Sequence, residues 1–367
     1  MIRLALREVR RRPRRFAGAG GVLTLVMVLL VFLGGLLDGL FLGSTGAIRV
    51  QRADVLTYSE NARDQFLRSR IDPALRARVE AAPGVREAGG LGVTLVGARI
   101  PGRDQRADAA VIGYELAPDG VPPTPPPGWG WADRRLRAAG AREGQTLRLG
   151  PRGVPVRVRG FVSDTGYLLQ GGLWVAPATW RAVQNASLVD GAVGPGVFQV
   201  LAVRGAGDPR SLAAAIDAAT GGQTSSLTRE QAVFSLPGTR QQNRTFTGLI
   251  AATVVVAILV VALFFVLLTL ERTALYGVLK AVGASSGQLF AGVVVQALVI
   301  ALVAAGLGGA VALGLAGLMP AQVPVRIEPA RVGWSAVLLL VAAALGSAMS
   351  LRRVIRVDPA QAIGRAG

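Results

Sequence analysis

Residues 245–270 read TFTGLIAATVVVAILVVALFFVLLTL and contain no charged side chain. A bilayer core about 30 Å thick needs roughly 20 consecutive apolar residues in a helix, so this stretch predicts a transmembrane helix. Three further uncharged tracts are long enough for the same role, at residues 16–37, 281–325 and 332–351. About two hundred polar residues separate the first tract from the second. The chain is therefore expected to be a membrane protein with one large water-exposed domain.

Composition supports this division and excludes several classes of function. Residues 45–244 contain 25 arginines and 17 acidic residues, whereas the four tracts are almost free of charge. Cysteine and histidine are absent, which excludes disulfides, thiol catalysis, imidazole bases and the usual zinc or haem ligands. Lys280 is the only lysine among 40 basic residues, a bias typical of a GC-rich genome. The basic pI therefore does not predict a nucleic-acid partner.

The charges that flank the tracts predict the topology. Seven arginines precede the first tract and four follow the last, and such short basic flanks favour the cytoplasmic side. A cleaved or twin-arginine signal peptide at Arg14-Arg15-Phe16 is the alternative, but the first tract exceeds a typical signal-peptide core. We expect a multi-pass protein of the inner (cytoplasmic) membrane, with these segments: a basic amphipathic cytoplasmic N-terminus (1–15), a first span (16–42), an extracytoplasmic domain (43–244), a second span (245–270), a cytoplasmic segment (271–285), a third span (286–319), a short external loop (320–331), a fourth span (332–351) and a cytoplasmic C-terminus (352–367).

The tract at 281–325 is predicted to hold one helix rather than two. Ser285 followed three residues later by Gln288 forms a capping-box pattern, so the helix should begin near residue 286. Small residues recur at every fourth position on two faces, which allows close helix contact. These faces serve either packing within one subunit or an interface between two, and we assign to a dimer interface Gly306, Ala310 and Gly314.

The external region reads as an α/β domain of two subdomains. Alternating apolar residues predict strands near 91–96, 109–116, 145–149, 154–161, 172–175 and 197–203. Helices are expected at 75–82, 178–184 and 208–219, the last capped by Asp208. Breaks in the pattern indicate a subdomain inserted at about 119–185. Within it, Trp129 and Trp131 are interpreted as part of a packed loop rather than as contacts to lipid or substrate.

Motifs for catalysis or metal binding are missing from the sequence. There is no G-x-x-x-x-G-K-[ST] phosphate loop, no G-x-S-x-G and no H-E-x-x-H, and the external acidic residues lack metal-ligand spacing. Asp38 is the acid at a membrane edge, where an ionisable group is a functional candidate, although solvation at the outer helix end is the simpler interpretation. We therefore expect neither an enzyme nor a resident cofactor or metal.

The cytoplasmic segment ERTALYGVLKAVGAS, residues 271–285, has its apolar residues at helical spacing. Leu275, Val278, Leu279 and Val282 form one stripe that predicts a short amphipathic helix ending at Gly283. This segment resembles the signature E-R-x-x-E-[IY]-G-[VL]-[LK]-[RK]-A-[LIV]-G-A of the FtsX-like or MacB-like permeases, the type VII ABC superfamily. The run 276–281 is similar to DevC-type exporter permeases.

A second match lies at the C-terminus, where RRVIRVDPAQAI at 352–363 resembles the family's closing R-R-A-x-R-L-D-P-x-E-A-L. Two positions depart from the family pattern, since Leu275 replaces an acid and Ser350-Leu351 replace a proline-containing helix end. These departures predict that the contact of this chain with an ATPase uses different residues from the contact in the family.

The resemblance implies four spans, a MacB-like periplasmic core between the first two, a homodimer, and a separate ATP-binding subunit that carries the ATP and Mg. It implies a permease that transmits ATP-driven motion to its external domain for export or extraction, with membrane lipid and a periplasmic adaptor as further partners. An FtsX-like signal transmitter that regulates a cell-wall hydrolase is the alternative, although the large external domain favours a transporter. The residues assigned to ATPase coupling are Glu271, Leu275, Gly277, Val278, Leu279, Lys280 and Gly283.

Overall fold

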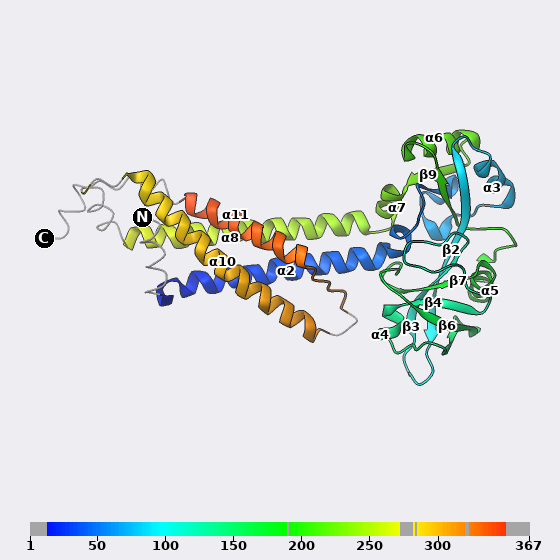
Figure 1. Cartoon of the computed structure of the whole chain (residues 1–367), viewed down its shortest axis with the longest axis horizontal. Coiled ribbons are helices and arrows are strands. Elements are labelled where there is room, and N and C mark those ends of the chain that lie inside the picture. The colour runs from blue at the N-terminus through cyan, green and yellow to red at the C-terminus, as the bar shows by residue number, and fades with distance from the viewer. Residues whose placement is uncertain (1–12, 189–190, 272–281, 283–284, 320–322, 350–367) are drawn as a thin grey trace. The chain divides into compact units, whose positions relative to one another are not determined.

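The computed structural model describes residues 13–188, 191–271, 282, 285–319 and 323–349. The chain divides into two compact units, Met1–Gly39 with Arg244–Gly367, and Leu40–Asn243. We call the first the membrane unit and the second the α/β unit. Long helices make up the first unit, and a sheet with short helices makes up the second (Figure 1).

Within the described residues, four helices are long and apolar enough to cross a bilayer, as the uncharged tracts predict. They are α2 (Pro13–Arg49), α8 (Thr239–Glu271), α10 (Ser286–Leu318) and α11 (Pro329–Met349). The tract at 281–325 contains one helix, and its predicted cap is confirmed. The Ser285 hydroxyl accepts a hydrogen bond from the amide of Gln288, and the Gln288 side chain accepts one from the amide of Ser285, both at 3.2 Å.

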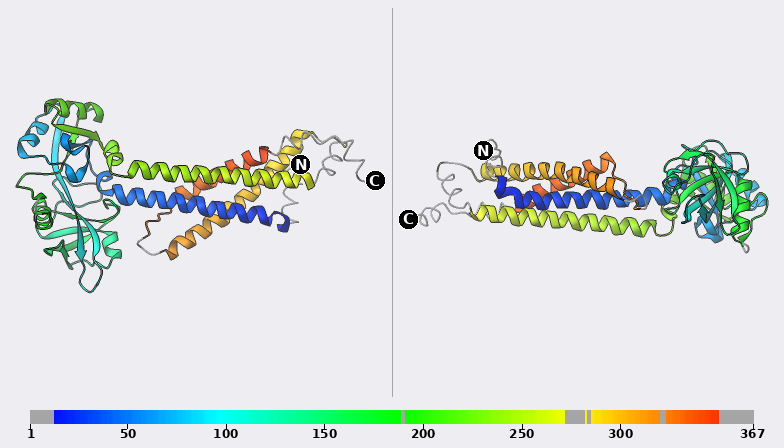
Figure 2. Two further views of the ribbon diagram at one scale, coloured as in Figure 1. Left: turned by 180° about the vertical axis from the view of Figure 1, so that it is seen from behind. Right: turned by 90° about the horizontal axis from the view of Figure 1, so that it is seen from below.

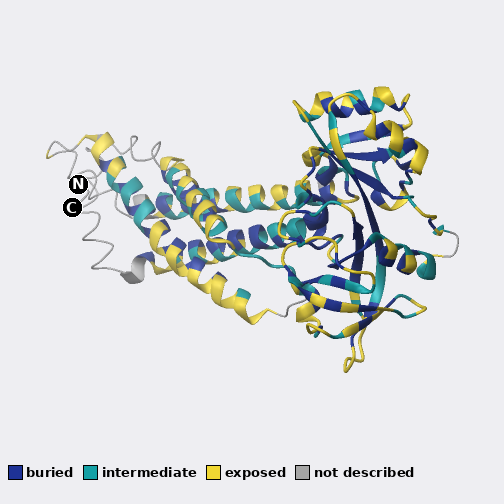
Figure 3. Cartoon of the chain, turned by 45° about the vertical axis from the view of Figure 1, so that its right-hand side comes forward, coloured by how far each residue is buried: buried dark blue, intermediate teal, exposed yellow. Residues whose placement is uncertain are grey.

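The membrane unit is held together by one apolar cluster to which all four helices contribute. Met27 of α2, Phe265 of α8, Ala301 of α10 and Leu339 of α11 are all nearly inaccessible within it. Close approach depends on small residues, because a Cβ added at Gly308 would lie 2.7 Å from the Met27 Cβ. Figure 2 shows α2 and α8 running alongside each other in this unit. Figure 3 shows exposed positions along these helices. Many of the exposed side chains are leucines and valines, as expected for surfaces that contact lipid.

The α/β unit contains a sheet in the order β3-β7-β4-β6-β5-β2-β8-β1-β9. An additional β3–β2 pairing closes part of this sheet into a ring of strands, in the order β2, β3, β7, β4, β6 and β5. The β3–β7 and β4–β6 pairs are parallel, and the other pairs are antiparallel. The strands are β1 (Val55–Ser59), β2 (Val85–Arg99), β3 (Ala107–Tyr114), β4 (Trp129–Asp133), β5 (Thr146–Leu149), β6 (Val154–Val162), β7 (Gly171–Val175), β8 (Val200–Gly205) and β9 (Thr224–Thr228).

Short helices cover the sheet and complete its core. They are η1 (Glu60–Ala62), η2 (Phe66–Arg68), α3 (Pro73–Glu80), α4 (Arg134–Ala138), α5 (Pro177–Ser187), α6 (Pro209–Ala219) and α7 (Arg229–Ser235). Trp180 of α5 is fully buried because Gly92 and Gly113 on neighbouring strands leave room for its indole. Asp208 accepts a hydrogen bond from the amide of Ser211 at 3.0 Å, which confirms the predicted cap of α6.

Two expectations from the sequence require correction. The strand predicted near residues 91–96 is longer than expected. Strand β2 has 15 residues, because its first half pairs with β8 and its second half pairs with β3 and β5. Trp129 and Trp131 do not belong to a packed loop but to strand β4, which lies between β6 and β7. The segment 119–185, predicted to be an inserted subdomain, supplies β4 to β7, and these strands close the ring together with β2 and β3.

Candidate functional site

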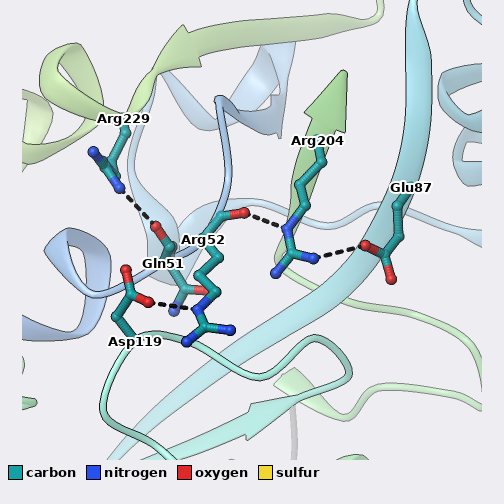
Figure 4. A network of polar contacts seen from close by, with 6 residues as sticks. All are labelled: Gln51, Arg52, Glu87, Asp119, Arg204 and Arg229. Atoms are coloured by element: carbon teal, nitrogen blue, oxygen red, sulfur yellow. Dashed lines mark hydrogen bonds and ion pairs between the residues drawn. The ribbon is translucent and has the colours of Figure 1, made fainter. Parts of the chain in front are cut away.

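The C-terminal end of α2 lies in a cluster of polar contacts within the α/β unit (Figure 4). Helix α2 ends at Arg49, and the chain that follows it is held through its backbone carbonyls. Arg229 Nη1 donates to the Gln51 carbonyl at 3.0 Å, and Arg204 Nε donates to the Arg52 carbonyl. The buried Gln51 side chain donates back to the Ala47 carbonyl at 2.8 Å. Two guanidinium groups therefore hold the chain where α2 ends.

Each of these arginines is positioned by an element of the sheet or by a helix start. Arg204 of β8 faces Glu87 of β2 across the ladder, and its Nη1 lies 2.9 Å from Glu87 Oε2. Arg229 is the first residue of α7, a helix that begins with a capping box at Thr228. The amide of Arg229 also donates to the Asp54 carbonyl at 3.3 Å. Strands β2 and β8 and helix α7 thus converge on the same short stretch.

We call residues 50–54 the joint segment, because they connect α2 to β1. The Asp54 amide donates to Val203 O at 2.9 Å, and Asp54 Oδ2 accepts from the amide of Gly205 at 3.0 Å. Arg52 pairs with Asp119 at 2.5 Å, but the two side chains are 57% and 61% exposed. An ion pair this exposed contributes only about 0.2–1 kcal/mol. The backbone-directed contacts of Arg204 and Arg229, rather than this surface pair, define the joint.

The approach to the second membrane helix begins close to the same cluster. Helix α7 ends at Ser235, and α8 begins at Thr239, whose amide donates to the Leu236 carbonyl at 3.2 Å. The Phe234 ring lies 6.0 Å from the ring of Phe41 on α2. Both chain connections between the α/β unit and the membrane unit are therefore anchored beside α7.

A second polar contact lies in the membrane unit, between α2 and the start of α11. Arg331 Nε and Nη2 lie 2.7 and 2.5 Å from the two carboxylate oxygens of Asp38. The side chains are 28% and 26% exposed, so the expectation that Asp38 is simply solvated is wrong. Glycines make the contact close, because a Cβ at Gly34 would lie 2.5 Å from Arg331 Cδ and one at Gly39 would overlap the Pro324 carbonyl.

The coupling residues predicted from the sequence fall almost entirely outside the described part of the chain. Glu271 ends α8, and its side chain is not among the described ones, as is also true of residues 272–281 and Gly283. Val282 is 82% exposed. Their role in binding an ATPase stays a prediction.

The face assigned to a dimer interface is not used for packing in a single chain. Gly306, Ala310 and Gly314 are exposed, and a Cβ added at either glycine would meet nothing within 4 Å. The second small-residue face of α10 packs within the chain instead, since Gly308 touches α2 and Ala312 is buried. Dimerisation through the first face stays a prediction.

Among the residues that the structure describes, no group of three or more Asp and Glu side chains could hold a metal ion. Burial raises the pKa of the Tyr58 and Tyr167 phenols above their usual range, which keeps them neutral as core residues. The sequence reasoning missed Arg204 and Arg229, because no local pattern distinguishes them from other arginines of this domain. Together, their contacts fix the short stretch of chain between α2 and β1.

Several known proteins are similar to this chain. Residues 247–359 match the model of the C-terminal region of FtsX-like permeases. An uncharacterised ABC transporter permease of Mycobacterium tuberculosis is 30% identical over 380 residues, covering 99% of both chains. Another from that organism is 40% identical over 110 residues, 30% of this chain and 31% of the relative's length. The periplasmic region of MacB from Actinobacillus actinomycetemcomitans has a TM-score of 0.34 at 13% identity, covering 50% of this chain and 92% of that one. The chain belongs to the FtsX-like family of ABC transporter permeases.

Proposed function

We propose that this permease is the membrane subunit of an ABC transporter in which a separate ATPase subunit moves the α/β unit, for export or extraction of a substrate. The partner ATPase binds ATP and Mg, in keeping with the missing phosphate loop in this chain. The protein lies in the cytoplasmic (inner) membrane with both termini in the cytoplasm and residues 43–244 outside, as the arginine-rich flanks indicate.

The observation that carries this proposal is the way α2 ends. Its 37 residues correspond to about 55 Å of helix, well beyond a bilayer core of about 30 Å. Residues up to Gly39 belong to the membrane unit, and Leu40 onwards belong to the α/β unit. Since Arg204 and Arg229 hold the residues that follow its last turn, displacement of α2 is expected to act on β8 and α7 rather than to be absorbed in a loose linker.

On the cytoplasmic side, the amphipathic segment 271–285 is proposed to dock on the ATPase. Leu275 and Leu279 on its apolar stripe would fill a groove of the partner, with Lys280 beside them. Two copies of the permease would associate through the exposed small-residue face of α10, and a periplasmic adaptor would bind the α/β unit. In this arrangement one ATPase pair drives two α2 helices.

The test uses the full chain reconstituted in nanodiscs with its ATPase. The protein has no native cysteine, so spin labels at Leu318 in the membrane unit and Arg210 in the α/β unit report motion between the units. We expect the label distance to shift on trapping with ATP and vanadate. Replacing both Arg204 and Arg229 by Gln should reduce that shift by more than half, while ATP hydrolysis and ATPase binding persist.

The matched control replaces Arg68 and Arg86 by Gln, because both are exposed arginines of the same unit outside the joint. An unchanged shift in the Arg204 and Arg229 variant would show that α2 does not transmit through the joint. ATP-dependent efflux of an amphiphilic dye would support transport. Motion without efflux, together with activation of a bound cell-wall hydrolase, would replace transport by signal transmission.

A further inference from the structure

The outer surface of the strand ring carries an arginine-rich face on β4, β6, β5, the end of β2 and helix α4. Along β6 the side chains alternate, with Val156 and Val158 fully buried inside the ring and Arg157 and Arg159 exposed outside. We call this face the arginine wall, and its members are Arg99, Trp129, Trp131, Arg137, Arg148, Arg157, Arg159 and Phe161. It lies wholly within the α/β unit and shares no residue with the joint segment.

Three guanidinium groups of the wall stack on aromatic rings. Arg157 lies 4.8 Å from the Trp129 ring centroid, Arg159 lies 5.2 Å from that of Trp131, and Arg137 lies 5.3 Å from that of Phe161. Contacts this close are attractive, and stacking over a ring leaves N–H donors in the guanidinium plane able to bind an oxyanion. Arg157 Nε is already engaged, since it donates to the Gly144 carbonyl at 2.8 Å, so the Nη donors of Arg157 serve this role. The stacking holds the arginine side chains in place before any partner arrives, which lowers the entropy lost on binding.

The remaining cations of the wall repel one another. Arg99 of β2 and Arg148 of β5 are directly opposite in the ladder, and like charges in that position are destabilising. Within the described residues, none of the five wall arginines forms an ion pair with a carboxylate. Asp133 of β4 is buried and accepts hydrogen bonds from Thr165. The wall is therefore a preorganised cationic surface, and a negatively charged partner would reduce the repulsion between its arginines.

We propose that the arginine wall docks the acidic surface of an extracytoplasmic protein partner. Its composition is that of a protein interface core, where tryptophan and arginine are enriched and lysine, glutamate and aspartate are depleted. The indoles of Trp129 and Trp131 lie against guanidinium groups, and the Trp131 Nε1 donates to Pro123 O at 3.3 Å. Rings engaged in this way are poorly placed to insert into a bilayer or to stack on a sugar. Docking on this face does not depend on the transport function.

The experiment measures binding to the purified full chain by fluorescence anisotropy. The probe is a fluorescein-labelled peptide of alternating glutamate and serine, and labelled heparin and vesicles of anionic phospholipid stand for a polysaccharide and a membrane. We expect the peptide to bind the wild type. The double variants R157E/R159E and R99E/R148E should each bind it at least about tenfold more weakly.

The second pair replaces one like-charge pair across the β2–β5 ladder by another, so the repulsion between the two strands is similar and folding should not be impaired. The control R68E/R86E makes the same charge change on η2 and near the start of β2, outside the wall, and should bind within about twofold of the wild type. Equal weakening in the control would show unspecific attraction to a basic protein and overturn the proposal. Heparin or vesicle binding that depends on the wall, with no peptide binding, would also overturn it.

Discussion

Replacing Asp38 by Ala removes the carboxylate that holds Arg331 through two hydrogen bonds of 2.7 and 2.5 Å. Fully exposed ion pairs contribute about 0.2–1 kcal/mol, whereas removing one partner of a buried pair costs about 3–5 kcal/mol. The two side chains are 26% and 28% exposed, between these limits but screened by solvent. We therefore expect an interaction energy of about 1–2 kcal/mol between Asp38 and Arg331.

A double-mutant cycle isolates this energy from the packing of the arginine stem. The Arg331 side chain lies against Gly34, so Arg331→Ala alone also removes apolar contacts. The free energies of unfolding of the wild type, D38A, R331A and the double variant are measured by titrating the protein in mixed micelles with denaturing detergent. The difference between the double change and the sum of the single changes gives the coupling.

The neighbouring pair Arg326 and Glu328 provides the control. Its atoms are 3.1 Å apart and its side chains are 42% and 50% exposed, so its coupling should stay below about 1 kcal/mol. Additive effects of D38A and R331A, within about 0.3 kcal/mol, would refute the reasoning that this contact ties α2 to α11.

Three further results are expected. Gly39→Ala should destabilise the protein by about 1–3 kcal/mol in the same titration, because its Cβ would overlap the Pro324 backbone, whereas Gly18→Ala, with open space around it, should not. Thr228→Ala removes the capping box of α7 and should cost about 1 kcal/mol, seen as faster hydrogen exchange of α7 amides; unchanged exchange would contradict this. Burial raises the pKa of Tyr58 above its unfolded value of about 10, so the folded state keeps its proton longer and the free energy of unfolding falls as pH rises above about 10. Tyr58→Phe should flatten that fall, and an equal slope in both proteins would exclude Tyr58 as its source.

The amino-acid sequence alone determined the membrane part of this protein. In a bilayer core every backbone amide and carbonyl must form its hydrogen bond within the protein. Each of the four long uncharged tracts meets this requirement as a helix, however the helices then pack. Local hydrogen bonding likewise determined the start of α10 at Ser285 and the cap of α6 at Asp208. The family match at 271–285 and 352–363 depends on consecutive residues, so it also was readable without a structure.

Only the tertiary structure decided how the α/β unit is built and what it holds. Strand β4 follows a proline-rich stretch and resembles a loop in sequence. It is a strand because it pairs with β6 and β7, which come later in the chain. Arg229 and Arg204 are separated from the carbonyls of the joint segment by 178 and 152 residues, and Arg331 from Asp38 by 293. A polar contact of that kind depends on where the sheet and the helices bring distant segments together. The spacing of residues along the chain therefore does not predict it. The same holds for the arginine wall, where hydrogen-bond register places Arg99 opposite Arg148.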